Sequence, residues 1–263
     1  MDDLGMLSEE LSRYLVLQGF PVAVKMVRDV SDLERMYHRD KPIRRLSKRL
    51  MVCQLLAQAR FYGRIVAGED KNLNVCRLGG DAMGFEVDDY THVYAGTYFN
   101  TYDAARKMIE TMPKFERGKY RAMVVAPLDR APLQPDVVVI FGNAAQMLRV
   151  ANGYLYNKGG RLDFSCSGDA GVCSDPIVIP MQTGKPSIAI PCNGGRMLSI
   201  PNETDLVCGI PFNVLGEVIE GIKFTAVNVP VQYPTAWQHI DWEPQPPILH
   251  FLRPELRGKA ENP

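Results

Sequence analysis

Residues 136–153, DVVVIFGNAAQMLRVANG, decide the fold class of this chain. Their first part, DVVVIFG, is a short, continuous, valine-rich run, which is typical of a strand buried on both faces. The run leads straight into a helical pattern that begins at Ala144, with Asn143 as its N-cap and Gly153 at its end. A buried strand followed at once by a helix favours a fold that mixes α and β structure.

Similar short apolar runs recur on both sides of this stretch. They predict strands at 21–27, 72–76, 123–128, 162–166, 176–180, 187–191 and 205–211. Apolar residues at helical spacing predict helices at 4–18, at 48–66 with Ser47 as N-cap, at 101–112 with Thr101 as N-cap, and at 213–224. Together these elements predict an α/β or α+β fold, in which several helices cover a mixed sheet of short strands.

The chain has 263 residues, which suffices for one large domain or two small ones. We expect one compact mixed domain over residues 1–232. Residues 233–263 are rich in proline and carry both tryptophans, Trp237 and Trp242, which predicts an extended C-terminal arm. Such an arm wraps its own core or a partner subunit, so we expect a homo-oligomer or a subunit of a complex.

Composition excludes several classes of partner. Lys and Arg number 30, as do Asp and Glu, so no net charge draws in nucleic acid or anionic lipid. No apolar run approaches the roughly 18 residues of a membrane span. The acidic N-terminus lacks the pattern of a signal peptide. We therefore expect a cytoplasmic protein that binds neither nucleic acid nor membrane.

The six cysteines are the residues most indicative of chemistry. A reducing cytoplasm disfavours structural disulfides, and no pair has the C-x-x-C spacing of zinc ribbons or ferredoxins. Cys76, Cys173 and Cys192 adjoin the turn-forming segments CRLGGD, SGDAGVCSDP and PCNGGR. Cys166 and Cys208 lie in apolar runs, which favours plain core residues. Cys53 is on the inner face of its expected helix, either as a buried residue or as a ligand.

These turns suit a metal or iron–sulfur site. Four thiolates around a [4Fe–4S] cluster carry a net charge near −2, which cations and backbone N–H groups offset. Glycines allow backbone amides to approach the sulfur atoms. The residues expected to contact such a cofactor are Arg77, Gly79, Gly80, Asn193, Gly194 and Arg196. A mononuclear zinc site with four cysteines is the alternative cofactor.

The order of six segments resembles the family catalogued as domain of unknown function 169, found in archaea and anaerobic bacteria. The segments are KRLMVCQLLAQARFYG, NVCRLGGDAMGFE, PDVVVIFGNAAQMLRV, AGVCSDPIVIP, GKPSIAIPCNGGR and DLVCGIPFNVLGEVIEGI. The family has no established activity, but its cysteine pattern implies Cys53, Cys76, Cys173 and Cys192 as the ligand set. Its association with anaerobes agrees with an oxygen-sensitive cluster.

The favoured function is thus a cytoplasmic iron–sulfur protein with one [4Fe–4S] cluster in anaerobic metabolism. Four cysteine ligands imply electron transfer or redox sensing, whereas three leave one iron open as a Lewis acid. The matching partner is a redox protein or a small-molecule substrate. No catalytic motif is present, so the sequence assigns no catalytic residue and leaves open whether the protein is an enzyme.

The alternative function is a non-redox accessory module that binds an anionic small molecule or a partner protein. Gly142 and Asn143 precede a helix, where free backbone N–H groups bind anions. Arg60, Arg64 and Arg77 are the candidate cations. A structural four-cysteine zinc protein is a further alternative.

Overall fold

The structure is a computed structural model that describes residues 3–37, 43–199 and 201–228. The expected C-terminal arm, 233–263, lies outside the described residues together with its tryptophans.

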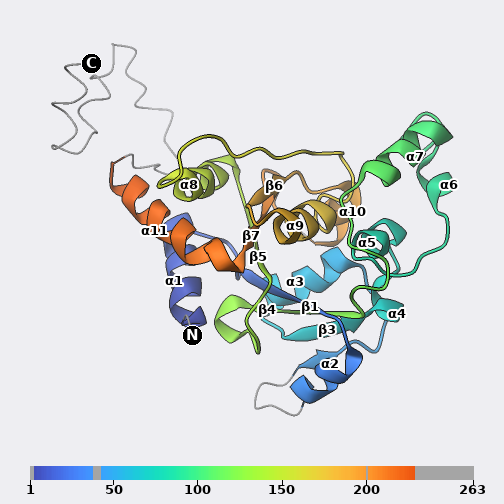
Figure 1. Cartoon of the computed structure of the whole chain (residues 1–263), viewed down its shortest axis with the longest axis horizontal. Coiled ribbons are helices and arrows are strands. Elements are labelled where there is room, and N and C mark those ends of the chain that lie inside the picture. Colours follow the sequence, from blue (N-terminus) through green and yellow to red (C-terminus); the bar gives the residue numbers. More distant parts are fainter. Residues whose placement is uncertain (1–2, 38–42, 200, 229–263) are drawn as a thin grey trace.

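The described residues form a seven-stranded sheet in the order β2-β3-β4-β1-β5-β7-β6 (Figure 1). Neighbouring strands are antiparallel except β2 and β3, which are parallel, so the expected mixed sheet of short strands is confirmed. The strands are β1 Val22–Val27, β2 Arg44–Arg45, β3 Val66–Glu69, β4 Ala122–Pro127, β5 Val137–Gly142, β6 Ser187–Ala189 and β7 Leu206–Pro211.

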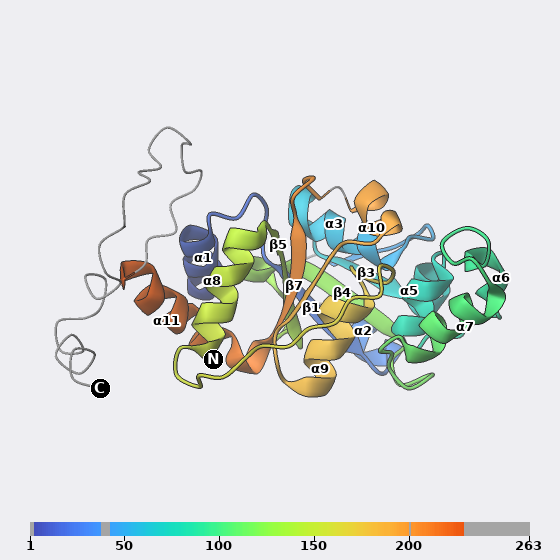
Figure 2. The ribbon, with the colours of Figure 1, turned by 90° about the horizontal axis from the view of Figure 1, so that it is seen from above.

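Helices cover both faces of the sheet, as Figure 2 shows. One face packs against α1 Leu4–Leu15, α8 Ala144–Leu155 and α11 Phe212–Asn228. The other packs against α3 Val52–Tyr62, α5 Arg77–Ala82, a π-helical turn Ser174–Val178 with α9 Ile179–Thr183, and α10 Asn193–Leu198. The remaining helices are α2 Val30–Tyr37, α4 Asp70–Leu73, α6 Thr91–Tyr94 and α7 Tyr102–Thr111, with a 3-10 turn at Leu128–Arg130.

Side chains of β1 alternate between the two resulting cores. Val22, Val24 and Met26 join the core under α3, whereas Ala23 joins the core under α8 and α11. Successive side chains of a strand point to opposite faces of the sheet. The valine-rich runs are therefore buried on both sides, as their composition predicts.

The expected helix end at Gly153 is wrong, because Gly153 lies inside α8. A Cβ atom there would lie 2.5 Å from the carbonyl oxygen of Val218 on α11. This glycine therefore lets two helices pack backbone against backbone. It marks a close approach of helices rather than a helix end.

Several other local predictions also fail. Residues 72–76 form the end of α4 and a turn, and 162–166 are irregular. Residues 176–180 pack on the sheet as the π-helical turn and α9, because Gly209 of β7 admits the carbonyl oxygen of Pro176 to within 1.8 Å of where a Cβ would be. The helix expected at 48–66 begins at Val52, with Met51 rather than Ser47 as N-cap.

Candidate metal centre

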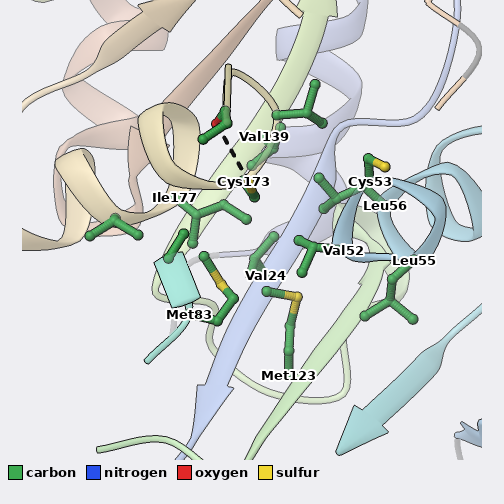
Figure 3. Packing of buried hydrophobic residues seen from close by; sticks show 14 of the residues in the cluster. Val24, Val52, Cys53, Leu55, Leu56, Met83, Met123, Val139, Cys173 and Ile177 are labelled. Carbon is green, nitrogen blue, oxygen red and sulfur yellow. Dashed lines mark hydrogen bonds between the residues drawn. The ribbon is translucent and has the colours of Figure 1, made fainter. Parts of the chain in front are cut away.

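Four of the six cysteines line one pocket of about 470 Å³ on the α3 side of the sheet. They are Cys53, Cys76, Cys173 and Cys192. These are the four cysteines that the family resemblance implies as ligands. Figure 3 shows Cys53 on α3 and Cys173 in the loop before the π-helical turn, among valines of the sheet. The fold thus gathers four segments that are far apart in the sequence.

Each cysteine stands at the start of a helical segment. Cys76 and Cys192 are the N-caps of α5 and α10, Cys173 is the N-cap of the π-helical turn, and Cys53 is the second residue of α3. The first backbone N–H groups of a helix have no partner within the helix and favour negative charge. The four cysteines therefore stand beside backbone dipoles that favour negative charge, although Cys76, Cys173 and Cys192 make no side-chain hydrogen bond to the helices they cap.

Backbone amides also act on the acidity of these thiols. Against the larger effect of burial, the amides of Gly171 and Gly195 lower the pKa of Cys192, and that of Ser174 lowers the pKa of Cys173. Amide donors of this kind surround the sulfur ligands of iron–sulfur clusters and tune their potential.

Two glycines hold the cysteine-bearing loops together. A Cβ on Gly171 would lie 2.0 Å from the carbonyl oxygen of Ile190, and one on Gly195 would lie 2.4 Å from Cγ2 of Val172. A side chain at either position would push apart the segments that carry Cys173 and Cys192. Gly171 and Gly195 are thus required by the approach of the two loops.

Distances between the cysteine-bearing segments also indicate that the four cysteines surround one pocket. A Cβ on Gly79 would lie 3.7 Å from Cβ of Cys76 and 3.8 Å from Sγ of Cys173. Sγ of Cys53 lies 4.0 Å from the carbonyl oxygen of Gly194, two residues beyond Cys192.

The loop before Cys173 contains a strained residue. Ala170 has a φ of 57°, in the left-handed region that residues other than glycine, asparagine and aspartate rarely enter. Its carbonyl oxygen accepts hydrogen bonds from the backbone N–H groups of Cys173 and Ser174 and lies 3.5 Å from Sγ of Cys173. Strain of this kind concentrates at functional sites, where the surrounding structure maintains it.

Burial makes the metal-free thiols weak acids. Burial, together with the neighbouring Cys192 and Cys76, raises the pKa of Cys53 to about 12. Burial also raises the pKa values of Cys173 and Cys192. Because metals bind the thiolate, a cationic centre must displace protons here, and its charge then stabilises the closely spaced anions.

The predicted cofactor contacts divide into two groups. Arg77, Gly79 and Gly194 line the pocket, whereas Gly80, Asn193 and Arg196 are not among its lining residues. The guanidinium of Arg196 donates instead to the carbonyl oxygen of Glu203, at 3.1 Å. Of the two arginines expected to offset cluster charge, Arg77 alone therefore faces the pocket.

The two other cysteines behave differently from each other. Cys208 is fully buried on β7, in the core under α8 and α11, as expected for a core residue. Cys166 is exposed in the irregular segment 162–166, so its assignment to the core is wrong.

Sequence reasoning missed the polar groups on the other walls of the pocket. Tyr90, Tyr94 and Tyr98 line it, and so does Asp169. Burial, and then the neighbouring Cys76, raise the pKa of Tyr94, and the hydroxyl of Tyr90 donates to Asp81 at 2.8 Å. The four-residue spacing of the tyrosines was the available signal, but it required the segment 90–98 to be recognised as helical in part.

A second pocket, of about 340 Å³, lies at the start of α8 and contains Gly142 and Asn143. There the backbone N–H of Asn143 donates to Oε1 of Gln146 at 2.7 Å, and the N–H of Gln146 donates to Oδ1 of Asn143 at 3.1 Å. A Cβ on Gly142 would lie 2.4 Å from the same Oε1 atom, so this glycine makes room for the capping box.

The arginines expected to bind an anion are largely engaged elsewhere. Arg60 forms a buried ion pair of 2.8 Å with Asp205, which lines the second pocket, and Arg64 donates to Gln58 at 2.6 Å. These partners weigh against an anion site at the α8 start.

Two general properties of the described residues bear on function. Within the ranges that the structure describes, no group of three or more Cys, His, Asp or Glu side chains is placed to hold a metal ion. In the same ranges, no helix has both the length and the apolar character needed to cross a bilayer.

The fold and the pocket define a mixed α/β protein with four cysteines gathered on one face of its sheet. The chain belongs to the family described as uncharacterised ArCR, domain of unknown function 169, whose sequence profile matches residues 10–221. It is similar to the uncharacterised protein MJ0308 of Methanocaldococcus jannaschii, with 27% identity over 223 residues, covering 82% of this chain and 92% of that protein. No solved structure matches the chain.

Proposed function

We propose that this protein is a cytoplasmic iron–sulfur protein that holds one [4Fe–4S] cluster through Cys53, Cys76, Cys173 and Cys192. The observation that carries the proposal is the convergence of these four cysteines, from four separate segments, on one pocket. Structural cysteines have no reason to gather in this way, because each is satisfied by ordinary apolar packing.

The residues present fit the charge of such a cluster. Helix starts at every cysteine, and backbone amides that lower the pKa of Cys173 and Cys192, supply partial positive charge around the sulfur atoms. Arg77 adds a full positive charge on the pocket wall. Together they offset the net negative charge that four thiolates bring to a cluster.

The size of the pocket is what favours a cluster over mononuclear zinc. A single zinc ion requires four sulfur atoms at about 2.3 Å from one point. In a [4Fe–4S] cluster each cysteine binds a different iron, so the sulfur atoms stand further apart around a larger space. A pocket of about 470 Å³ has room for the second arrangement.

When bound, such a cluster supplies one-electron chemistry or, at an iron without a cysteine ligand, a Lewis acid. The chain's own contribution is to hold the thiolates and to bury them. Cys53 and Cys173 are each less than a tenth exposed, which limits contact with water and oxygen.

The test is to measure iron and acid-labile sulfide on protein purified without oxygen. We expect about four of each per chain, with broad absorption near about 400 nm that dithionite bleaches. Cys192→Ser should lose most of both. Cys166→Ser is the matched control, because Cys166 is exposed and outside the pocket, and it should retain wild-type iron.

Wild-type protein without iron and sulfide would refute the proposal. Zinc at one ion per chain, released by a thiol reagent and lost in Cys192→Ser, would replace the cluster with a structural zinc site.

A further inference from the structure

The wall of the cysteine pocket contains a buried carboxylate that is not one of the proposed cluster ligands. Asp169 is 7% exposed and lines the pocket. Across the described ranges, its carboxylate has neither a hydrogen-bond partner nor an ion-pair partner, and only its backbone groups bond, to the hydroxyl of Ser167. A buried carboxylate without a partner is unfavourable, so a group that binds in the pocket and pairs with it is expected.

Aromatic rings stand in the same pocket. The rings of Tyr94 and Tyr98 are inclined at 38° with their centroids 5.7 Å apart, and Tyr90 packs edge-on against Tyr94 at 5.9 Å. The faces of aromatic rings attract cations, and several rings together bind quaternary ammonium groups. Tyr98 is half-exposed, which leaves its ring accessible to an entering ligand.

The net charge of the pocket also favours a cation. The cluster proposed above is anionic and Asp169 adds a negative charge, whereas Arg77 is the one cation among the lining residues. Arg77 is exposed, so solvent screens its charge more than that of Asp169.

The remaining walls of the pocket indicate the chemical character of the rest of the ligand. They are apolar and include Met51, Val75, Val93, Met197 and Leu198. Val75, Val93 and Met197 are also exposed, so they form an apolar rim around the opening. Pockets of this kind bind small molecules with apolar bodies, oriented by a few polar groups.

We infer that the cysteine pocket binds a small organic cation, an amine with apolar substituents, with Asp169 as its counter-ion and Tyr94 and Tyr98 around the cationic group. The inference rests on the proposed function for the cluster's share of the negative charge. It deepens that function, because it makes the protein a receptor for a substrate beside the cluster and not only a carrier of electrons.

The experiment compares three probes of similar size by calorimetry on the anaerobic full-length protein. They are tetramethylammonium, neutral tert-butanol and anionic pivalate. We expect tetramethylammonium to bind about tenfold more tightly than tert-butanol, and pivalate not to bind. Equal binding of the three probes, no binding, or a preference for pivalate would overturn the inference, the last by making Arg77 the dominant charge.

Two variants locate the contact. Asp169→Asn should weaken tetramethylammonium about tenfold or more, and Tyr98→Leu should weaken it several-fold. Asp163→Asn removes the same charge from an exposed position in the same segment and should bind as wild type. Equal effects of Asp169→Asn and Asp163→Asn would exclude Asp169 as the counter-ion.

Iron and sulfide measured on the same samples separate this inference from the proposed function. Protein that contains the cluster but does not prefer the cation refutes the inference and leaves the function standing. Protein that lacks the cluster but prefers the cation, in a manner that depends on Asp169, refutes the function and supports the pocket assignment.

Discussion

The cysteine pocket and the pocket at the start of α8 correspond to the two functions that the sequence suggests, because in both a turn leads into a helix start. At α8 the polar groups are satisfied by their own neighbours: Asn143 by Gln146, and Asp205 by Arg60. In the cysteine pocket, thiols and the carboxylate of Asp169 face a shared space. A helix start therefore indicates a ligand only where the chain itself leaves its polar groups open.

The buried ion pair near α8 and the buried cysteines differ in the same way, because only the ion pair is satisfied within the chain. The side chains of Arg60 and Asp205 are 3% and 6% exposed, and Arg60 also stacks on Phe61 and Phe141. That pair fastens α3 to Asp205, the residue before β7. Under the proposed function, the buried cysteines instead need a metal to stabilise their thiolate form, and the filled pocket supplies it.

The largest expected effect is the loss of iron from the cysteine pocket, with no loss when the core on the other face of the sheet is changed. Cys173→Ser should lose nearly all iron, because it removes one of the four proposed ligands. Cys208→Ser is the matched control, since Cys208 is equally buried but lies in the core on the other face of the sheet. It should keep wild-type iron while losing about 1 kcal/mol of stability. Equal iron content in the two variants would show that burial, and not the pocket, determines the result.

The next prediction concerns stability at the pocket at the start of α8, where the polar groups already have partners. Asp205→Ala should lower the free energy of unfolding by about 3–5 kcal/mol, because it leaves the buried Arg60 guanidinium unpaired. Urea unfolding measures this loss. The double variant Arg60→Met with Asp205→Leu should recover most of it, since apolar residues can replace a buried pair. A double variant as unstable as Asp205→Ala would mean that the pair itself, with its stacking on Phe141, holds α3 in place.

A third prediction uses the pH dependence of the metal-free protein. Burial raises the pKa of Cys53 to about 12, whereas a thiol in the unfolded chain ionises near about 8.5. Above that lower value the unfolded state loses its proton first, so stability falls as pH rises, by up to roughly 1.4 kcal/mol per pH unit for each such thiol.

Urea unfolding between pH 8 and 10 (roughly the onset of thiol ionisation) tests this slope. Cys53→Ala should lose stability less steeply than wild type, while Cys166→Ala, at an exposed position, serves as the control. Identical slopes in wild type and Cys53→Ala would mean that Cys53 has the same pKa in the folded and unfolded states, so that burial does not raise it. The α8 pocket contains no thiol and should not contribute to this difference.

The sequence predicted the sheet better than the loops. The valine-rich runs of β1, β4 and β5 and the caps Thr101 and Asn143 carry their signal locally, so their prediction needed no tertiary contact. The apolar run of residues 176–180 predicts a strand, but these residues form the π-helical turn and the start of α9, which approach Gly209 closely. That contact joins segments far apart in the chain, which periodicity cannot detect.

The candidate site shows the same limit. The four cysteines came from a family pattern, and their convergence needed the whole fold. No sequence motif marks Asp169 or the tyrosines, because their proposed role depends on which side chains lack a partner once the pocket has folded. Arg196, close to Cys192 in the sequence, turned instead toward Glu203.

The smallest expected effect tests whether the α8 start is only a cap. Asn143→Ala should lower the free energy of unfolding by about 1 kcal/mol, because it removes the acceptor for the backbone N–H of Gln146. Iron content and tetramethylammonium binding should stay at wild-type values, since Asn143 lines the other pocket. Asn143→Asp is the matched control, because aspartate caps a helix equally well and should retain stability. A variant that folds normally but loses iron or ligand binding would mean that the two pockets are coupled through β5, and the distinction between a closed and an open helix start would fail.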